Sequence, residues 1–224
     1  AKLASLGELS AGVAHEINNP LAIIAGNLDL IPRLVNDSVK FEAKILAMRK
    51  ATERISKIIN GLQKFSRSSD NRKFVYLKIS NIINEVGILI ESKSKKFSTP
   101  VEFICLKDFE IFCDEIEIEQ VLINLINNGI DAVKNLEQRW IQVIFIDEGN
   151  VARIQVRDSG PGIPKEIAKN IFQPFFTTKI VGEGTGLGLS IVKGIVDDHG
   201  GKIEILENDS NTCFEIVLNK NERV

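Results

Sequence analysis

The chain contains two histidines, and the first of them, His15, stands among residues that suit nucleophilic chemistry. Glu16 follows it at once, and Asn19 lies four residues on, one helical turn further along the same face. A neutral imidazole is a competent nucleophile because its unperturbed pKa is about 6.5, and a neighbouring carboxylate can orient the ring and accept its proton. An ordinary exposed helix histidine beside an ordinary glutamate has the same pattern, so this segment alone leaves both interpretations open.

A second group of polar residues suits a magnesium ion. Asn124 and Asn128 are four residues apart in a segment with helical periodicity, so both amides project from one face, and Asp131 lies a turn further on. Mg²⁺ prefers hard oxygen ligands and usually keeps waters and substrate phosphates in its shell. An amide oxygen is such a ligand, and it does not repel a triphosphate. A polar helix face without a ligand remains the alternative.

The segment DSGPGIP (158–164) begins where a strand is expected to end. Asp158 can accept a hydrogen bond from an adenine amino group, and Gly160 and Gly162 allow the backbone to approach a flat base closely. A tight glycine–proline turn would have the same composition, so the segment alone does not decide between them.

A second glycine-rich segment, GEGTGLGLS (182–190), opens an expected helix that ends near Asp198. Its glycines at 184, 186 and 188 expose backbone N–H groups at a helix N-terminus, which is a phosphate-binding arrangement. The segment does not match the dinucleotide fingerprint, because no strand immediately precedes it and no βαβ unit follows. It also lacks the Lys-Ser/Thr ending of the other common phosphate loop.

Between the two glycine segments lies IFQPFFTTK (171–179). Phe172, Phe175 and Phe176 belong either to the core or to the hinge of a mobile lid. Lys179 is positioned to reach a phosphate group.

The elements that must carry these residues fall into two parts. Apolar residues at alternating steps of three and four predict a long amphipathic helix over residues 3–35, with His15 off the apolar seam and interruptions at Pro20 and Pro32. A polar break at 36–38 and a second apolar stripe over 41–65 predict an antiparallel helical hairpin. One hairpin cannot bury both stripes, so we expect a homodimer that forms a four-helix bundle.

The polar segment Ser66–Lys73 predicts a boundary, with a helical domain at 1–68 and a second domain at 69–224. The second domain is expected to be an α+β two-layer sandwich, with helices on one face of a mixed sheet. Its expected strands are 74–79, 101–106, 111–113, 140–147, 151–158, 202–207 and 212–218. Its expected helices are one that Ser80 caps and that runs to about 94, one at 115–136 that turns Ile116, Val121, Leu122, Leu125 and Ile126 inward, and one at 187–198.

Composition excludes some partners. The 224 residues include 28 basic and 30 acidic side chains, and a net charge of −2 argues against a nucleic-acid footprint. No apolar run approaches the roughly 20 residues of a membrane span, so we expect no membrane contact by this part of the protein. Because Ala1 already lies inside the periodic segment, the chain is expected to be part of a longer, cytoplasmic protein. Three cysteines without metal-ligand spacing are expected to be reduced core residues.

Taken together, the segments resemble the motif core of bacterial sensor histidine kinases over roughly residues 3–218. HEINNPL (15–21) resembles the phospho-acceptor box, and QVLINLINNGIDAV (120–133) resembles the asparagine box. DSGPGIP resembles the first glycine box, IFQPFFTTK the phenylalanine box, and GTGLGLSIVKGIV (184–196) the second glycine box. The order and the separations of the five boxes also agree with the family.

The resemblance implies an ATP-binding fold of the Bergerat type, shared with type II topoisomerases and the ninety-kilodalton heat-shock chaperones. It implies that His15 is the phosphorylated nucleophile, that Glu16 is its acid/base partner, and that Asn19 positions water for dephosphorylating a response-regulator receiver domain. Asn128 would hold Mg²⁺. The implied nucleotide contacts are Asn124, Asn128, Asp131, Asp158, Gly160, Gly162, Lys179, Gly184, Thr185, Gly186, Leu187 and Gly188.

One position departs from part of the family. Some of these kinases carry a basic residue three positions after the metal asparagine, whereas this chain has Asp131. The Asn-x-x-Asp-Ala form resembles the nitrogen-regulation-like branch, and it puts that phosphate contact in doubt. The other histidine, His199, precedes two glycines at an expected helix end, where it is expected to pair with terminal carbonyls.

Two other functions compete with an autokinase that passes its phosphoryl group to a regulator. A Bergerat ATPase that drives conformational change would need a transducer domain, and only residues 219–224 follow the last expected strand. Such proteins also lack a histidine hairpin in front. A dimeric scaffold without activity is the other alternative, and the intact asparagine, aspartate and glycine positions argue against it.

Overall fold

The structure is a computed structural model of the 224-residue chain, and it describes residues 17–34, 37–65, 72–179, 184–206 and 211–221. The chain divides into two compact units. The helical unit comprises Ala1–Arg67 and Gln173–Leu187, and the sheet unit comprises Ser68–Phe172 and Gly188–Val224.

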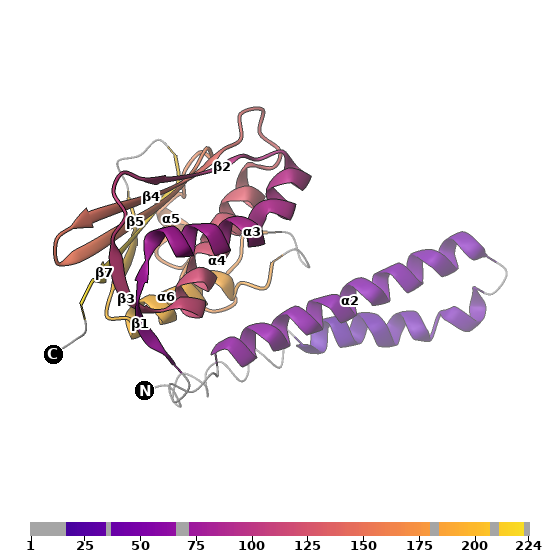
Figure 1. Ribbon diagram of the computed structural model, residues 1–224. Helices are drawn as coiled ribbons and strands as arrows, with labels where there is room; N and C mark the ends of the chain where they lie inside the picture. The colour runs from indigo at the N-terminus through magenta and orange to yellow at the C-terminus, as the bar shows by residue number, and fades with distance from the viewer. Residues whose placement is uncertain (1–16, 35–36, 66–71, 180–183, 207–210, 222–224) are drawn as a thin grey trace. The chain divides into compact units, whose positions relative to one another are not determined.

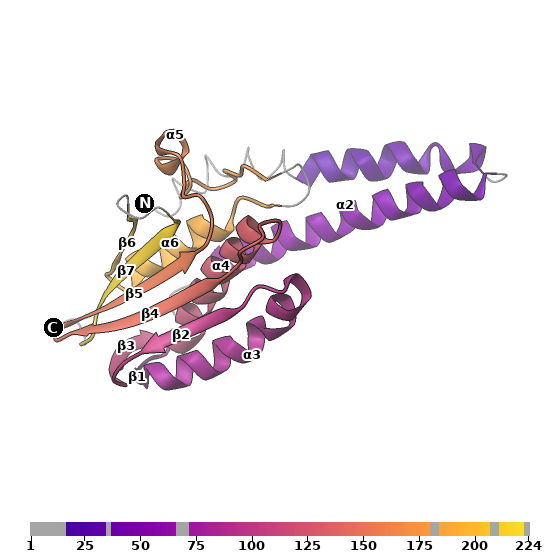
Figure 2. The ribbon, with the colours of Figure 1, turned by 90° about the horizontal axis from the view of Figure 1, so that it is seen from above.

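The helical unit contains a helix over residues 17–28, the 3₁₀ turn η1 (Ile31–Arg33) and the long helix α2 (Ser38–Phe65). The two helices lie side by side and run in opposite directions (Figure 1, Figure 2), which confirms the predicted hairpin. Pro32 lies in η1, after the first helix has ended, so the interruption predicted there is a helix end rather than a bend.

Much of the apolar surface of this hairpin remains exposed. Ala51 and Ile58 are buried, but other large apolar side chains of the hairpin face solvent: Leu21, Ile23, Leu28, Leu30, Val39, Ile45, Leu46 and Ile59. So much exposed apolar surface on a two-helix hairpin is typical of half of a helical bundle.

The sheet unit is built on a five-stranded sheet in the order β2-β4-β5-β7-β6. Strands β2 and β4 pair in parallel, and the other neighbours pair antiparallel. The strands are β2 (Val101–Cys105), β4 (Ile141–Glu148), β5 (Val151–Asp158), β6 (Lys202–Ile205) and β7 (Cys213–Asn219). Two further strands, β1 (Phe74–Lys78) and β3 (Glu110–Asp114), form a separate antiparallel pair.

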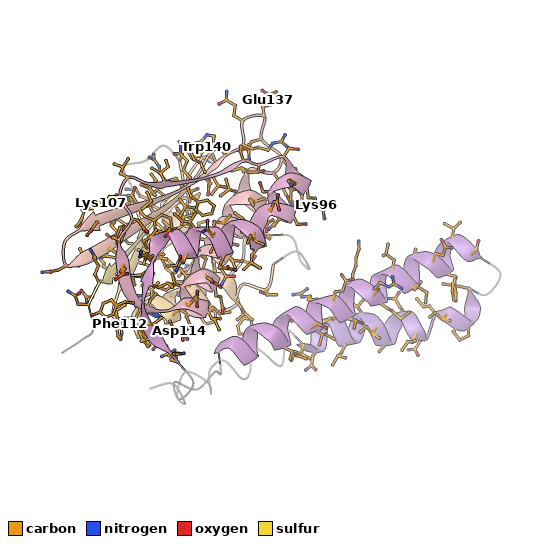
Figure 3. The ribbon with its side chains drawn as sticks, viewed as in Figure 1. Lys96, Lys107, Phe112, Asp114, Glu137 and Trp140 are labelled. Atoms are coloured by element: carbon orange, nitrogen blue, oxygen red, sulfur yellow. The ribbon has the colours of Figure 1, made fainter. Side chains whose placement is uncertain are left out.

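Three helices form the second layer, and a short fourth, α5 (Lys165–Ala168), follows β5. Helix α4 (Glu115–Val133) contacts β4 and β5, and it is flanked by α3 (Ile79–Phe97) and α6 (Gly188–Asp198), as Figure 2 shows. Side chains fill the space between the helices and the sheet in Figure 3. The predicted two-layer α+β sandwich is therefore confirmed.

Helix α4 buries one apolar stripe against the sheet. The buried residues are Ile118, Val121, Leu122, Leu125, Ile126, Gly129, Ile130 and Val133. Ile116 was expected to point inward, but its side chain is 58% exposed, so that expectation is wrong. At 100° per residue, Ile118 is in phase with Val121 and Leu125, whereas Ile116 lies on the opposite side of the helix.

The cap of α3 also differs from the prediction. The helix begins at Ile79, so Ser80 lies inside the first turn rather than at the N-cap. The backbone N–H and the hydroxyl of Ser80 both donate to the Asp108 carboxylate, at 3.0 and 2.8 Å. A side chain from the loop between β2 and β3 therefore accepts a hydrogen bond from a free backbone N–H in the first turn of α3. Local sequence cannot reveal such a distant partner.

The beginning of the sheet unit is held by a cluster around Asp114, which Figure 3 labels. The Arg72 guanidinium pairs with Glu117 at 2.9 Å and with Asp198 at 2.5 Å. The backbone N–H of Lys73 donates to Asp114 Oδ2 at 2.9 Å. Residues 72 and 73 therefore belong to the sheet unit, and the predicted boundary segment does not extend through them as a free linker.

His199 is buried at the end of α6. Its Nδ1 lies 2.9 Å from the carbonyl oxygen of Ile195, and its Nε2 accepts the backbone N–H of Asp114 at 3.1 Å. The expected contact with a terminal carbonyl is confirmed, and the second bond ties α6 to the start of α4.

The three cysteines are free thiols. Cys113 and Cys213 are core residues as expected, whereas Cys105 is only half-buried. Burial raises the pKa of the Cys113 thiol to about 12, so it is unreactive near neutral pH. No helix in the described part of the chain has the length and apolar character of a membrane span.

Candidate functional site

Asp158 ends strand β5 at a position that the alternation of the strand turns toward the core. Ala152, Ile154 and Val156 precede it on the same buried side, and Asp158 itself is 5% exposed. Burial raises the pKa of its carboxyl above the usual value, and hydrogen bonds from the Gly160 N–H and the Thr212 hydroxyl partly oppose that rise. A carboxylate is thus held in an apolar layer, where a hydrogen bond to a ligand is strong.

Helix α4 approaches this carboxylate closely because residue 129 is a glycine. A Cβ atom placed on Gly129 would lie 3.3 Å from Cβ of Asp158 and 2.7 Å from Cδ1 of Ile141. A larger residue would push α4 away from β4 and β5. Sequence reasoning missed Gly129, although it stands directly after Asn128.

The N-terminus of α6 lies near Asn128. A Cβ atom placed on Gly188, the first residue of α6, would be 3.9 Å from Nδ2 of Asn128. The first N–H groups and the dipole of an 11-residue helix favour an anion at this end. Asn124 lies one turn earlier on α4 and, like Asn128, is half-buried. The structure therefore brings Asn128, Asp158 and Gly188 together around one part of α4.

The turn after Asp158 is fixed by residues that come from the start of β7. The Gly160 N–H donates to Asp158 Oδ1 at 2.8 Å, and the side-chain amide of Asn211 donates to the Gly160 carbonyl at 3.1 Å. The Asp158 N–H donates to the Thr212 carbonyl at 3.1 Å. Gly162 has a φ of +84°, with open space where a Cβ would stand. Asn211 and Thr212 were not predicted, because they lie some 50 residues further along the chain.

The segment Gln173–Leu187 has its own internal contacts. Gly186 has a φ of +67°, and a Cβ there would lie 2.3 Å from the carbonyl carbon of Phe175, which itself has a φ of +66°. A Cβ on Gly184 would lie 3.2 Å from Cδ of Lys179. The Thr185 hydroxyl accepts the Leu187 N–H at 3.4 Å. Gly184 thus lies beside Lys179 and Gly186 lies against Phe175, whereas residues 180–183 lie outside the described part.

The phenylalanines of the segment 171–179 differ in their surroundings and backbone conformation. Phe172 is half-buried and lies edge-on to Phe214 of β7, with ring centroids 6.4 Å apart, so it packs against the sheet unit. Phe175 instead takes a left-handed backbone conformation that is strained for a non-glycine residue, which is typical of a functional turn.

Asp131 has a cation beside it. Its Oδ1 lies 2.7 Å from Nζ of Lys93 on α3, and the same ammonium donates to the Asn127 carbonyl at 3.1 Å. Lys93 was not singled out from the sequence, because nothing local connects it with a segment nearly 40 residues away.

The expected phosphoryl acceptor lies outside the described residues, as does its neighbour: His15 and Glu16 precede residue 17. Asn19 is described, and its side chain is exposed on the helix over residues 17–28. An exposed amide at this position is accessible to a partner protein.

The donor set around α4 suits a metal ion that arrives with a phosphate ligand. Within the described residues, no three His, Cys, Asp or Glu side chains are grouped so that they could hold a metal ion. The Asn128 amide oxygen is the kind of single protein ligand that Mg²⁺ accepts when waters and phosphates complete its shell.

Two families match different parts of the chain. Residues 5–71 match the His Kinase A (phospho-acceptor) domain. Residues 113–222 match the family described as histidine kinase-, DNA gyrase B-, and HSP90-like ATPase. The predicted phospho-acceptor box thus lies in the first matched region, and the other four predicted boxes lie in the second.

Individual relatives agree with this result. The C4-dicarboxylate transport sensor protein DctB of Rhizobium meliloti is 34% identical over 98% of this chain, which spans 35% of DctB. The solved catalytic domain of histidine kinase ThkA is 37% identical, with a TM-score of 0.59 over 66% of this chain and 96% of that domain. The structure of ThkA in complex with response regulator protein TrrA has a TM-score of 0.79 at 32% identity, over 98% of this chain and 63% of that one. The chain belongs to the sensor histidine kinases of two-component systems.

Proposed function

We propose that the chain binds ATP with Mg²⁺, transfers the γ-phosphoryl group to its own His15, and passes it to an aspartate of a response regulator. The observation that carries the proposal is the convergence of Asn128, Asp158 and Gly188 around α4. An adenine acceptor, a metal-ligand oxygen and an anion-binding helix end are what a nucleoside triphosphate requires.

The proposed nucleotide contacts come from α4, from the turn after β5 and from the second glycine-rich segment. Asp158 accepts a hydrogen bond from the adenine amino group, and the turn at Gly160 and Gly162 lies against the base. Asn128, with Asn124 nearby, offers the oxygen ligand for Mg²⁺, which when bound neutralises phosphate charge. The glycines at 184, 186 and 188, Thr185, Leu187 and Lys179 hold the phosphates.

The proposed chemical step uses the imidazole of His15. One ring nitrogen attacks the γ-phosphorus, the bond from phosphorus to the β,γ-bridging oxygen breaks, and ADP leaves. Glu16 orients the ring and accepts its proton. The match of residues 5–71 to the phospho-acceptor family supports this assignment.

The proposed partners are a second copy of the chain and a receiver domain. The exposed apolar stripes of both helices support a four-helix bundle between two copies. The solved complex of ThkA with TrrA shows that a protein with this fold binds a response regulator. Because the reaction consumes ATP, we place the chain in the cytoplasm.

A phosphatase activity toward the regulator is part of the proposal. Asn19 is exposed, one helical turn from His15 in sequence, and an amide there can orient a water molecule toward a phospho-aspartate. The regulator and the nucleotide-bearing unit would then use the surface around His15 at different times.

Incubation with γ-labelled ATP and Mg²⁺ on a filter separates this proposal from a motor ATPase and from an inactive scaffold. An autokinase retains the label on the chain, an ATPase releases labelled phosphate without labelling the chain, and a scaffold does neither. ATP labelled at the α-phosphate is the control, because it labels the filter only if nucleotide itself remains bound. Label retained from both forms of ATP would contradict phosphoryl transfer.

A further inference from the structure

Helix α4 carries an acidic side chain close to the proposed phosphate site. Asn124, Asn128 and Asp131 are spaced by four and three residues, so they lie on one face of the helix. A triphosphate held near Asn128 would be repelled by a bare carboxylate one turn away. The site therefore requires a cation that compensates Asp131.

That cation comes from another helix. Nζ of Lys93, on α3, lies 2.7 Å from Asp131 Oδ1 and 3.1 Å from the carbonyl oxygen of Asn127, the residue before Asn128. The two contacts hold the ammonium at the backbone of the turn that presents the Asn128 amide. Lys93 of α3 thus lies beside the face of α4 that carries the two asparagines, whereas position 131 of α4 itself is acidic.

The pair is accessible to a ligand. The side chains of Lys93 and Asp131 are 29% and 25% exposed, so neither is sealed in the core. A second lysine pair on the same helix, Lys95 with Glu91, is far more exposed, at 75% and 61%, and is formed within α3 alone. Of these two pairs, the Lys93 pair is the one that joins α3 to the helix that carries Asn124 and Asn128.

We propose that Lys93 is a phosphate-binding residue of the nucleotide site and that Asp131 positions it. Asp131 would then contact the lysine rather than the nucleotide. The inference rests on the proposed nucleotide site. It assigns to Lys93 the phosphate contact that a basic residue at position 131 would otherwise make. The ligand chemistry is a polyphosphate chain attached to adenosine.

The alternative is a structural bridge between α3 and α4. A bridge would affect binding of adenosine and of ATP alike, because it would act through the shape of the unit. A phosphate contact affects ATP and leaves adenosine unchanged, since adenosine has no phosphate. Comparison of the two ligands therefore separates the interpretations.

The test titrates ATP and adenosine against the whole chain and its Lys93→Met, Lys93→Gln and Lys93→Arg variants. Lys95→Met is the matched control, because it removes a lysine and an ion pair from α3 without touching Asp131. Lys93→Gln retains a donor for the Asn127 carbonyl without the charge, and thermal melting establishes that each variant is folded. We expect Lys93→Met and Lys93→Gln to weaken ATP binding about tenfold, as loss of a charge-assisted contact implies.

Adenosine binding should stay unchanged in these variants, Lys93→Arg should retain ATP affinity, and Lys95→Met should match the unaltered chain. A second basic residue should also rescue the loss: Asp131→Lys combined with Lys93→Met should restore ATP binding. Unchanged ATP affinity in Lys93→Met, or equal losses for ATP and adenosine, would overturn the inference alone. Failure of the unaltered chain to bind ATP would overturn the nucleotide site itself, and the inference with it.

Discussion

At the scale of single residues, Asp158 combines a stability cost with a binding role. Its carboxyl continues the buried alternation of β5, and desolvation raises its pKa above the value of 3.8 typical of an exposed aspartate. In the unfolded chain the group ionises near 3.8, whereas the native state holds its proton to higher pH. Between the unfolded-state pKa and the higher native-state pKa, the native state binds more protons than the unfolded chain. The free energy of unfolding therefore falls as the pH rises through this range, and it remains lower at higher pH.

Replacement of Asp158 by asparagine should therefore have opposite effects on stability and on binding. Asp158→Asn should melt at a higher temperature than the unaltered chain at pH 7, and the difference should shrink as the pH is lowered toward 4. ATP binding should weaken roughly 10- to 100-fold, because a charge-assisted hydrogen bond to adenine is lost. Melting curves over this pH range and ATP titrations measure both. Unchanged ATP affinity would remove Asp158 from the site.

At the scale of elements, α4 is the platform on which the site is built. It carries both asparagines, it packs on the strand that ends in Asp158, and its Asn128 lies close to the first residue of α6. The contact with β4 and β5 depends on the missing side chain at Gly129. The position of α4 over the sheet therefore controls the distance between the expected adenine and metal contacts.

The Gly129→Ala substitution tests this dependence. The new methyl would lie 2.7 Å from Ile141 Cδ1 and 3.3 Å from Asp158 Cβ, so we expect a loss of stability of about 1–3 kcal/mol and weaker ATP binding. Gly194→Ala on α6 is the matched control. Outside the neighbouring backbone of α6 itself, no atom lies within 4 Å of its added methyl, and the helix propensity of alanine should make it neutral or stabilising. Equal behaviour of the two variants in chemical denaturation would contradict the packing argument.

The first helix supports a separate prediction. If the exposed Asn19 amide orients the water that hydrolyses a regulator's phospho-aspartate, Asn19→Ala should reduce dephosphorylation of the cognate regulator much more than autophosphorylation. Both activities are measured on the same preparation with labelled phosphate. Equal losses in the two activities would mean that Asn19 only supports the helix before Pro20.

Local patterns predicted the elements well, because hydrophobic periodicity is a property of short segments. The hairpin of β4 and β5, helix α6 and the position of Asp158 at a strand end all follow from such patterns. The errors and omissions involve contacts between distant segments. Asp108 replaces Ser80 as the cap of α3, and Lys93 reaches Asp131 across nearly 40 residues. Periodicity within one segment carries no information on such partners.

At the scale of the whole molecule, the two units differ in how fully they bury their apolar side chains. The sheet unit has a closed core, and the cluster of Arg72, Glu117 and Asp198 fastens its first described residues to α4 and α6. The helical hairpin, by contrast, has many exposed apolar side chains. The proposed partner for this apolar surface is a second copy of the chain.

Light scattering at micromolar concentration should therefore report a dimer. Leu28 is 53% exposed on the hairpin, and Leu28→Asp should shift the chain toward the monomer by placing a charge on the buried seam of the bundle. Ile88→Asp is the control, since Ile88 is 68% exposed on α3 of the sheet unit. A monomeric unaltered chain would contradict the prediction, as would equal effects of the two substitutions.

The central claim is that His15 receives the phosphoryl group, and the chain has only one other histidine to consider. Incubation with γ-labelled ATP and Mg²⁺ should label the unaltered chain and the His199→Gln variant, which melting curves must show to be folded. The His15→Gln variant should bind ATP and remain unlabelled. Label on His15→Gln comparable to that of the unaltered chain would contradict the account.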